Sequence, residues 1–183
     1  MITQYELKTS LGSVFWCVLP VKDHLDTILT VLSTASGMEL SRVDMKRTAD
    51  GRPEFPACGF DANWTHSKDV CVLAYSFTAK VGVDIEKLRP RALRIAERFF
   101  AKEETDLLFR SNLLPDEALM QFYRIWCRKE ALFKCIGGSF LGGILSENVL
   151  SDNVNGAILT DIQLPLEKPF AATIAVAPLP SKS

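Results

Sequence analysis

Asp84 and Glu86 are two carboxylates in a segment that alternates acidic residues with small or apolar ones. On a strand, both side chains would leave the same face about 7 Å apart, while Val83 and Ile85 would point to the other face. Carboxylates this close repel each other unless a cation lies between them, and carboxylate oxygens are common ligands of Mg²⁺. The spacing fits a magnesium site, but taken alone it fits an exposed polar strand face paired with Lys or Arg better, because D-x-E is a common pattern.

Glu130 and Lys134 lie four residues apart in a segment with helical periodicity, 115–136. As an ordinary helix pair they would contribute only about 0.2–0.5 kcal/mol. Lys129 adds a second cation beside this third carboxylate. Phosphoryl transfer is catalysed mainly by positioning and charge neutralisation, so the carboxylates and lysines together indicate metal-assisted phosphoryl transfer.

The elements that must position these residues are predicted from periodicity and turn residues. Two prolines and a glycine within 51–56 indicate a loop of fixed shape. Strands are predicted at 2–7, 14–19, 70–77, 81–86, 158–164 and 170–177, and helices at 23–32, 93–109 (in two turns) and 115–136, the last ended by Gly137-Gly138. This order predicts an α+β fold of two halves that meet near Lys80.

Composition narrows the class of protein. The 183 residues are 48% hydrophobic and carry a formal net charge of −1, so there is no global basic field for nucleic acid or a membrane surface. Five cysteines without a CxxC pair indicate reduced thiols rather than disulfides or a zinc site. The chain has no apolar run near the roughly 20 residues needed to span a bilayer, and no signal-peptide pattern. We therefore expect a soluble, cytoplasmic protein.

The segments 82–86 (GVDIE) and 126–134 (WCRKEALFK) together resemble the paired signature of the 4′-phosphopantetheinyl transferases of the two-domain Sfp type. Two weaker blocks of that family precede them in the expected order, 51–53 (GRP) and 63–67 (NWTHS). The residues on either side of the second signature are similar to the AcpT-like holo-[acyl-carrier-protein] synthases. The resemblance covers roughly residues 51–138.

This resemblance implies a fold and an activity. The fold would be two similar α+β halves, 1–80 with coenzyme A contacts and 81–183 with the metal and catalytic motifs, related by a pseudo-twofold axis around an active-site cleft. The activity would be transfer of the 4′-phosphopantetheine group of coenzyme A to a serine of an apo acyl, polyketide or peptidyl carrier protein, with release of adenosine 3′,5′-bisphosphate. We expect a monomer, because two joined halves can form internally the cleft that smaller relatives build between subunits.

The resemblance also implies roles for the three carboxylates. Asp84, Glu86 and Glu130 would hold Mg²⁺, or Mn²⁺, against the pyrophosphate of coenzyme A. Glu130 would in addition accept the proton of the carrier serine, directly or through water.

Coenzyme A contacts are implied by the same motifs. Lys129 and Lys134 would pair with phosphate oxygens, with Lys134 counted among the catalytic residues, and Arg52 would clamp a phosphate or contact the adenine-bearing end. His66 would contact a phosphate, and Thr65 keeps the hydroxyl of the serine usual at its position.

One departure from the family concerns the nucleotide end. Longer relatives supply basic residues before the GRP block. Here 23–37 contains no Arg or Lys, and the basic residues between that segment and Gly51 are Arg42, Lys46 and Arg47. The sequence therefore leaves open how the 3′-phosphate is held. His24 matches no motif and is expected to be structural or on the surface.

A cationic stripe was a further candidate, for contact with an acidic carrier helix. Its members repeat every three or four residues: Arg91, Arg94, Arg98 and Lys102. A solvated face balanced by neighbouring glutamates is an equal alternative.

Two other functions remain open at this level. A metal-dependent hydrolase of nucleotide pyrophosphates would use the same carboxylates with water as the nucleophile. A non-catalytic module that binds carrier protein or coenzyme A is the second, although retention of all three carboxylates disfavours it.

Overall fold

The computed structural model of the chain describes residues 2–49, 51–90, 93–110, 112–137 and 143–179. Its first half contains β1 (Gln4–Thr9), β2 (Gly12–Pro20), α1 (His24–Ser36), the 3₁₀ turn η1 (Arg42–Asp44), β3 (Lys46–Arg47), β4 (Pro53–Glu54), β5 (Asp61–Ser67) and β6 (Val70–Ser76). The second half contains β7 (Ala79–Lys87), η2 (Leu93–Ile95), α2 (Ala96–Phe99), α3 (Lys102–Arg110), α4 (Pro115–Ile136), η3 (Ile144–Ser146), β8 (Asn153–Val154), β9 (Ala157–Asp161) and β10 (Phe170–Pro178).

The two main sheets share the topology of three of their four strands. The first has the strand order β1-β2-β6-β5 and the second β7-β10-β9-β8, with every neighbouring pair antiparallel. Within the first, β2, α1, β5 and β6 form a unit in which the last strand returns between the other two. The second repeats this unit as β7, α4, β9 and β10. The predicted α+β fold of two similar halves is confirmed, whereas a domain division at residue 80, the second residue of β7, stays a prediction.

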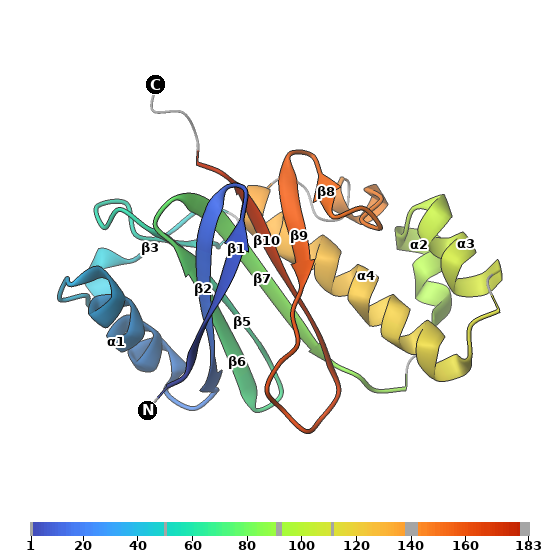
Figure 1. Cartoon of the computed structure of the whole chain (residues 1–183), viewed down its shortest axis with the longest axis horizontal. Coiled ribbons are helices and arrows are strands. Elements are labelled where there is room, and N and C mark those ends of the chain that lie inside the picture. The colour runs from blue at the N-terminus through green and yellow to red at the C-terminus, as the bar shows by residue number, and fades with distance from the viewer. Residues whose placement is uncertain (1, 50, 91–92, 111, 138–142, 180–183) are drawn as a thin grey trace.

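Apolar side chains fill three layers. One cluster lies between the sheets, where Val14 and Val72 meet Val83 and Ile174. Helix α1 covers the outer face of the first sheet, and α4 covers the outer face of the second. Figure 1 shows α1 and α4 on opposite sides of the strands, with α2 and α3 near the beginning of α4. Burial of apolar side chains in these layers supplies the main favourable term in folding.

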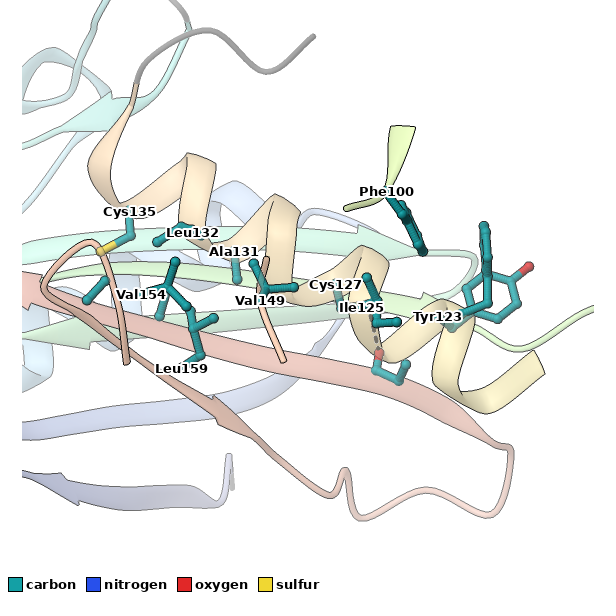
Figure 2. Close-up of a cluster of buried hydrophobic side chains, with 14 of the residues drawn as sticks. Phe100, Tyr123, Ile125, Cys127, Ala131, Leu132, Cys135, Val149, Val154 and Leu159 are labelled. Atoms are coloured by element: carbon teal, nitrogen blue, oxygen red, sulfur yellow. Dashed lines mark hydrogen bonds between the residues drawn. The ribbon is translucent and has the colours of Figure 1, made fainter. Parts of the chain in front are cut away.

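Helix α4 is the longest element of the second half, and its ends follow from local chemistry. Pro115 stands at the first helical position, where its missing N–H costs nothing, and Gly137 follows the helix at a φ of 77°. Its apolar side lies on β9 and β10, and Figure 2 shows Ala131 and Cys135 close to the side chains of Val154 and Leu159. The predicted bounds of 115–136 are confirmed, while Gly138 lies outside the described residues.

Side chains rather than backbone groups join the two halves where β5 and β7 lie side by side. Three oxygens of β5 side chains accept backbone N–H groups of β7, each twenty residues further along the chain. The pairs are Asp61 with Val81 (2.7 Å), Asn63 with Val83 (3.0 Å) and Ser67 with Lys87 (3.2 Å). We call this set of contacts the β5–β7 seam. It satisfies N–H groups on the edge of β7 that faces away from β10.

Several expectations from the sequence differ from the fold. The strand predicted at 158–164 ends at Asp161. Strand β5 was not predicted, because its polar side chains hide the usual apolar signal. Segment 51–56 is not entirely irregular, since Pro53 and Glu54 form the short strand β4 against β3. Helix α1 extends to Ser36, four residues beyond its predicted end.

Candidate functional site

Helix α4 crosses β7 in close contact at Gly82. A Cβ at this position would lie 2.2 Å from the carbonyl oxygen of Ala131 and 2.5 Å from the amide nitrogen of Cys135. Only glycine lets the two backbones approach this closely. The glycine of the first signature therefore brings that signature against the second.

Alternation along β7 then sorts its side chains. Val81, Val83 and Ile85 enter the core between the sheets. Gly82 contacts α4, and Asp84 and Glu86 share its face of the strand. The predicted alternation of faces in the D-x-E segment is confirmed.

Asp84 is the most buried carboxylate of the site, with 5% of its surface exposed. Its Oδ1 accepts a hydrogen bond from Lys134 Nζ at 2.6 Å and one from the Thr65 hydroxyl at 3.3 Å. Its Oδ2 is buried and accepts no hydrogen bond of normal geometry among the described residues; the neighbouring Cys127 thiol acts on the carboxylate but donates to the carbonyl of Ala171. Burial raises the pKa of Asp84, and the Lys134 ammonium opposes that shift. An unpartnered buried carboxylate oxygen is costly, so it marks a place where a ligand can bind.

Glu130 is a half-buried residue one turn before Lys134 in α4. Burial and the nearby charge of Asp84 raise its pKa to about 7, Lys134 acts in the opposite direction, and Glu86 adds a further increase. A carboxylate with this pKa exchanges a proton readily near neutral pH, as a general base must.

The three carboxylates can be tested as ligands of a hard cation. Chemically they fit, because Asp84 has a free oxygen and because Asp84 and Glu86 both raise the pKa of Glu130. Geometrically, no three Asp, Glu, His or Cys side chains among the described residues are grouped as a ready set of metal ligands. The predicted site thus has suitable donors. Their charges affect one another's pKa, but the three side chains do not converge on a single point where a metal ion would lie.

Lys134 and Thr65 complete this side of the site. Lys134 Nζ lies 3.3 Å from the Thr65 hydroxyl, and the lysine side chain is 25% exposed. Both residues therefore stand beside Asp84. A pocket of about 220 Å³ adjoins Lys134 and is lined in part by Trp64, Phe133 and Arg47.

His66 is exposed on β5, the neighbour of Thr65 in sequence. Its ring centroid lies 6.0 Å from that of His24, at the start of α1. His24 Nδ1 is 2.9 Å from the carbonyl oxygen of Val21, which fixes its ring. The two histidines of the chain are thus neighbours, and motif comparison alone had given His24 no place near His66.

Lys129 lies elsewhere, in the interior. Its ammonium pairs with Glu104 at 2.7 Å, both side chains are 0% exposed, and it also donates to the carbonyl of Glu147. The ring of Phe100 lies below it, with the centroid 5.3 Å away. Burial lowers the pKa of Lys129, and Glu104 opposes that shift. The structure does not bring Lys129 to Lys134 and Asp84, so its contact with a phosphate stays a prediction that this placement does not support.

Arg52 is also turned inward, with its side chain 7% exposed. It forms an ion pair with Asp61 and donates to the carbonyl oxygens of Lys134 (2.8 Å), Val81 (3.0 Å) and Pro53 (3.3 Å). Arg52 also lines the pocket beside Lys134. Four of its five N–H donors already have partners in the protein, so its contact with a phosphate or with the adenine-bearing end stays a prediction.

Sequence reasoning missed the residues that hold this arrangement. Asp61 and Asn63 belong to the β5–β7 seam, and the period-two repeat of small polar side chains in 61–67 was a signal that could have revealed it. Glu104 binds Lys129 and accepts the N–H groups of Ala101 and Val149 at 2.8 Å each. No local pattern around Glu104 marks it as buried.

Arg128, within the second signature, was given no role. It is buried and forms ion pairs with Asp161 (2.8 Å) and Asp152 (2.7 Å). These pairs raise the pKa of Arg128 against the opposing effect of burial, and the arginine side chains lower the pKa of Asp161. The network ties α4 to β9 on the side opposite the site.

The proposed cationic stripe is not one helix face. Arg94 and Arg98 are exposed in η2 and α2, whereas Lys102 begins the separate helix α3 and pairs with Asp106 at 2.7 Å. Arg91 lies outside the described residues. The expectation of one continuous face is wrong, because Phe100 turns into the core with extended backbone between α2 and α3.

None of the helices described is both long enough and apolar enough to cross a membrane.

Comparison with known proteins gives one consistent answer. A family model described as the 4′-phosphopantetheinyl transferase superfamily matches residues 80–176. The 4′-phosphopantetheinyl transferase HetI of Nostoc sp. (strain PCC 7120) is 35% identical over 115 residues, 59% of this chain and 47% of that protein. AcpT of Escherichia coli K12 is 40% identical over 92 residues, 49% and 46% of the two chains, and Sfp of Bacillus subtilis strain 168 is 39% identical over 83 residues, 45% and 34%. The matches thus span about half the length, or less, of these curated relatives.

Proposed function

This chain belongs to the 4′-phosphopantetheinyl transferase superfamily, and we propose that it transfers the 4′-phosphopantetheine arm of coenzyme A to a serine of an apo carrier protein. The observation that carries the proposal is the meeting of the two signatures. It sets the buried carboxylate of Asp84, with one free oxygen, against the Lys134 ammonium and beside Glu130, whose pKa is about 7.

The reaction exchanges one phosphorus–oxygen bond for another. The serine oxygen bonds to the β-phosphorus of coenzyme A, the bond from that phosphorus to the bridging oxygen breaks, and adenosine 3′,5′-bisphosphate leaves. Glu130 accepts the serine proton, directly or through water. Its raised pKa makes it a stronger base than an ordinary glutamate.

Lys134 and the carboxylates would neutralise negative charge on the phosphates during this step, the lysine directly and the carboxylates through a bound metal ion. The partly exposed ammonium of Lys134 is available to phosphate oxygens, which gain negative charge as the bond breaks. Asp84, Glu86 and Glu130 would hold Mg²⁺ or Mn²⁺. Such an ion, when bound, would act as a Lewis acid and a template for the pyrophosphate.

Binding of coenzyme A is proposed on the exposed side of these residues. Thr65 and the exposed His66 follow Asp84 along β5, and Lys134, which contacts Asp84, also lines the neighbouring pocket. We assign neither Arg52 nor Lys129 to coenzyme A, since their donors are engaged inside the protein. One chain supplies all these groups, which supports action as a monomer.

Mass spectrometry tests the proposal. Purified protein is incubated with Mg²⁺, coenzyme A and a panel of apo acyl, polyketide and peptidyl carriers. We expect at least one carrier to gain the mass of one phosphopantetheine arm, and the same carrier with its acceptor serine changed to alanine to gain none. Unmodified carriers across the whole panel would refute the proposal.

The same mixture without carrier separates transfer from hydrolysis. A transferase should leave coenzyme A intact, whereas a nucleotide pyrophosphate hydrolase would release adenosine 3′,5′-bisphosphate. Glu130→Gln should abolish the carrier modification. Unchanged activity in this variant would remove Glu130 from the chemistry.

A further inference from the structure

Arg52 has a set of hydrogen bonds that suits a structural tie better than a ligand site. Four hydrogen bonds run from its guanidinium, which carries five N–H donors, and all four end on acceptors within the protein. The side chain is 7% exposed, and that of its ion-pair partner Asp61 is 12% exposed. Arg52 lines the pocket beside Lys134, but only one of its N–H donors, on Nη1, is left for a ligand there.

The acceptors belong to three elements that meet at the site. Asp61 is the first residue of β5, Val81 lies in β7, and Lys134 is in the last turn of α4. Asp61 Oδ2 also accepts the N–H of Val81 at 2.7 Å, while Arg52 binds the carbonyl of Val81. The Arg52–Asp61 pair therefore binds both the N–H and the carbonyl of Val81. It includes the first contact of the β5–β7 seam, between Asp61 and Val81.

The bond from Arg52 Nε to the carbonyl of Lys134 connects residues 82 positions apart. Carbonyls in the last turn of a helix run out of helical N–H partners, and the negative end of the helix dipole favours a cation there. A guanidinium supplied by a different segment thus caps α4 and fixes the main chain of its last turn.

Lys134 is consequently held at both ends. Its carbonyl is bound by Arg52, and its ammonium lies 2.6 Å from Asp84 Oδ1. We propose that Arg52, with Asp61, is a positioning residue that fixes the last turn of α4 against the β5–β7 seam and thereby sets the Lys134 ammonium on Asp84. Its consequence for turnover rests on the proposed transferase function, but its effect on Lys134 does not.

Lysine cannot replace arginine in this role. A guanidinium is a planar fork that reaches several acceptors in fixed directions, whereas an ammonium is a compact charge at the end of a flexible stem. Arg52→Lys keeps the positive charge, which would serve a phosphate, and loses the fork. This substitution therefore separates positioning from phosphate binding.

The first experiment observes Lys134 directly, without catalysis. The ¹⁵N-detected signal of its NH₃⁺ group is followed by NMR in the wild type, Arg52→Lys, Asp61→Asn and the matched control Arg110→Lys. Arg110 pairs with Asp106 on the surface of α3, where it is 74% exposed. We expect the Lys134 signal to shift or broaden beyond detection in both seam variants and to be unchanged in the control. An unchanged signal in Arg52→Lys and Asp61→Asn, each confirmed folded by its amide spectrum, would overturn the proposal.

The second experiment separates kcat from coenzyme A binding. Displacing a reacting group by about 1 Å can lower a rate about 100-fold, so we expect kcat to fall by that order in both Arg52→Lys and Arg52→Gln. The Kd for coenzyme A, measured by calorimetry, should change by less than about threefold, because the Lys134 charge matters most for the negative charge that develops on the phosphate as the bond breaks.

The opposite pattern identifies a phosphate ligand. A Kd raised in Arg52→Gln and restored in Arg52→Lys, with kcat unchanged, would contradict the positioning role. Should the wild-type protein modify no carrier, the proposed function fails, and the Lys134 signal still decides this inference. The two failures are therefore distinguishable.

Discussion

Lys129 and Lys134 stand five residues apart in one helix, yet their surroundings are opposite. Five residues turn an α-helix by about 500°, which places the two side chains about 140° apart around its axis. Lys129 is sealed against Glu104 with 0% exposure, whereas Lys134 is 25% exposed beside Asp84 at the β5–β7 seam. One helix thus carries a structural lysine on one side and a lysine open to ligands on the other.

This difference shows that residues of the same type within one sequence signature can have different roles, depending on their burial. A fully buried charge needs a permanent partner, because leaving either charge alone in the interior is very unfavourable. A partly exposed charge can exchange partners at little cost. The same residue type in the same motif is therefore structural at position 129, whereas at position 134 it is open to ligands, where we propose that it takes part in the reaction.

The largest effect should follow from Lys129→Met. This change leaves the carboxylate of Glu104 buried without its partner, and loss of one partner of a buried pair costs about 3–5 kcal/mol of unfolding free energy. Urea denaturation measures that loss. Adding Glu104→Gln should recover part of it, while kcat per folded molecule stays within about threefold of wild type. A stable variant with weakened coenzyme A binding would instead place Lys129 in the site.

Lys134→Ala should show the reverse profile. We expect kcat to fall about 100- to 1000-fold, equivalent to about 2.7–4 kcal/mol, because the charge that meets the phosphate oxygens is gone. Unfolding free energy should fall by only about 1–2 kcal/mol, since Asp84 can take up a proton in place of its lost partner. Steady-state kinetics and urea denaturation are measured on the same sample. If this variant were as unstable as Lys129→Met, the contrast between the two lysines would not hold.

Gly82→Ala tests whether one substitution lowers both stability and activity. The added methyl group would meet the backbone of α4 at Ala131 and Cys135, and overpacking of this kind costs about 1–3 kcal/mol. Because the helix must move away from β7, the Lys134–Asp84 contact should suffer as well, and activity should fall with stability. Gly156→Ala is a control for a glycine replaced without a steric clash. Its φ of 78° makes alanine unfavourable for the backbone, but the space around its Cβ position is open. Equal losses of activity in both variants would rule out the close helix approach as the cause.

The smallest effect concerns pH. The pKa of Glu130 is raised from 4.5 to about 7 in the folded protein. Its stabilising contribution is fully present below the unfolded pKa and is lost as pH rises to about 7, because over that range the unfolded chain has released the proton that the folded state still binds. Unfolding free energy of the metal-free protein should therefore fall between pH 5 and pH 8.

Comparison of wild type with Glu130→Gln isolates this contribution. We expect the difference between the two proteins to change by about 1–2 kcal/mol across that range, after discounting for solvent screening of a half-buried group. Millimolar Mg²⁺ should restore stability to the wild type at pH 8 and much less to the variant. Parallel pH profiles for the two proteins would show that Glu130 does not titrate near 7.

Regular elements near the signatures were predictable because their causes are local. Helix α4 has the predicted bounds, since Pro115 and Gly137 define its ends and its apolar periodicity is long. Strand β7 was found from its alternation, which also predicted that Asp84 and Glu86 share a face. Helix propensity and alternation act over a few residues, so one sequence suffices to see them.

Partners distant in sequence were not predictable in this way. Lys129 meets Glu104 across 25 positions and Arg52 meets Lys134 across 82. Motif reasoning assigned Lys129 to a phosphate and Arg52 to a phosphate or the adenine-bearing end of coenzyme A. A charge in a signature does not reveal the interior acceptors that tertiary packing brings to it. Burial, which follows from the whole fold, separated Lys134 from the other two.

The β5–β7 seam has a consequence for how the halves can change. In a backbone ladder, strand spacing is the same whatever the side chains are, since the same N–H and C=O groups meet at every position. Here the spacer between the strands is the length of an aspartate, an asparagine or a serine. A single substitution in β5 can therefore change the distance or the angle between β5 and β7 at one contact of the seam. The backbone hydrogen bonds within each sheet would not be affected.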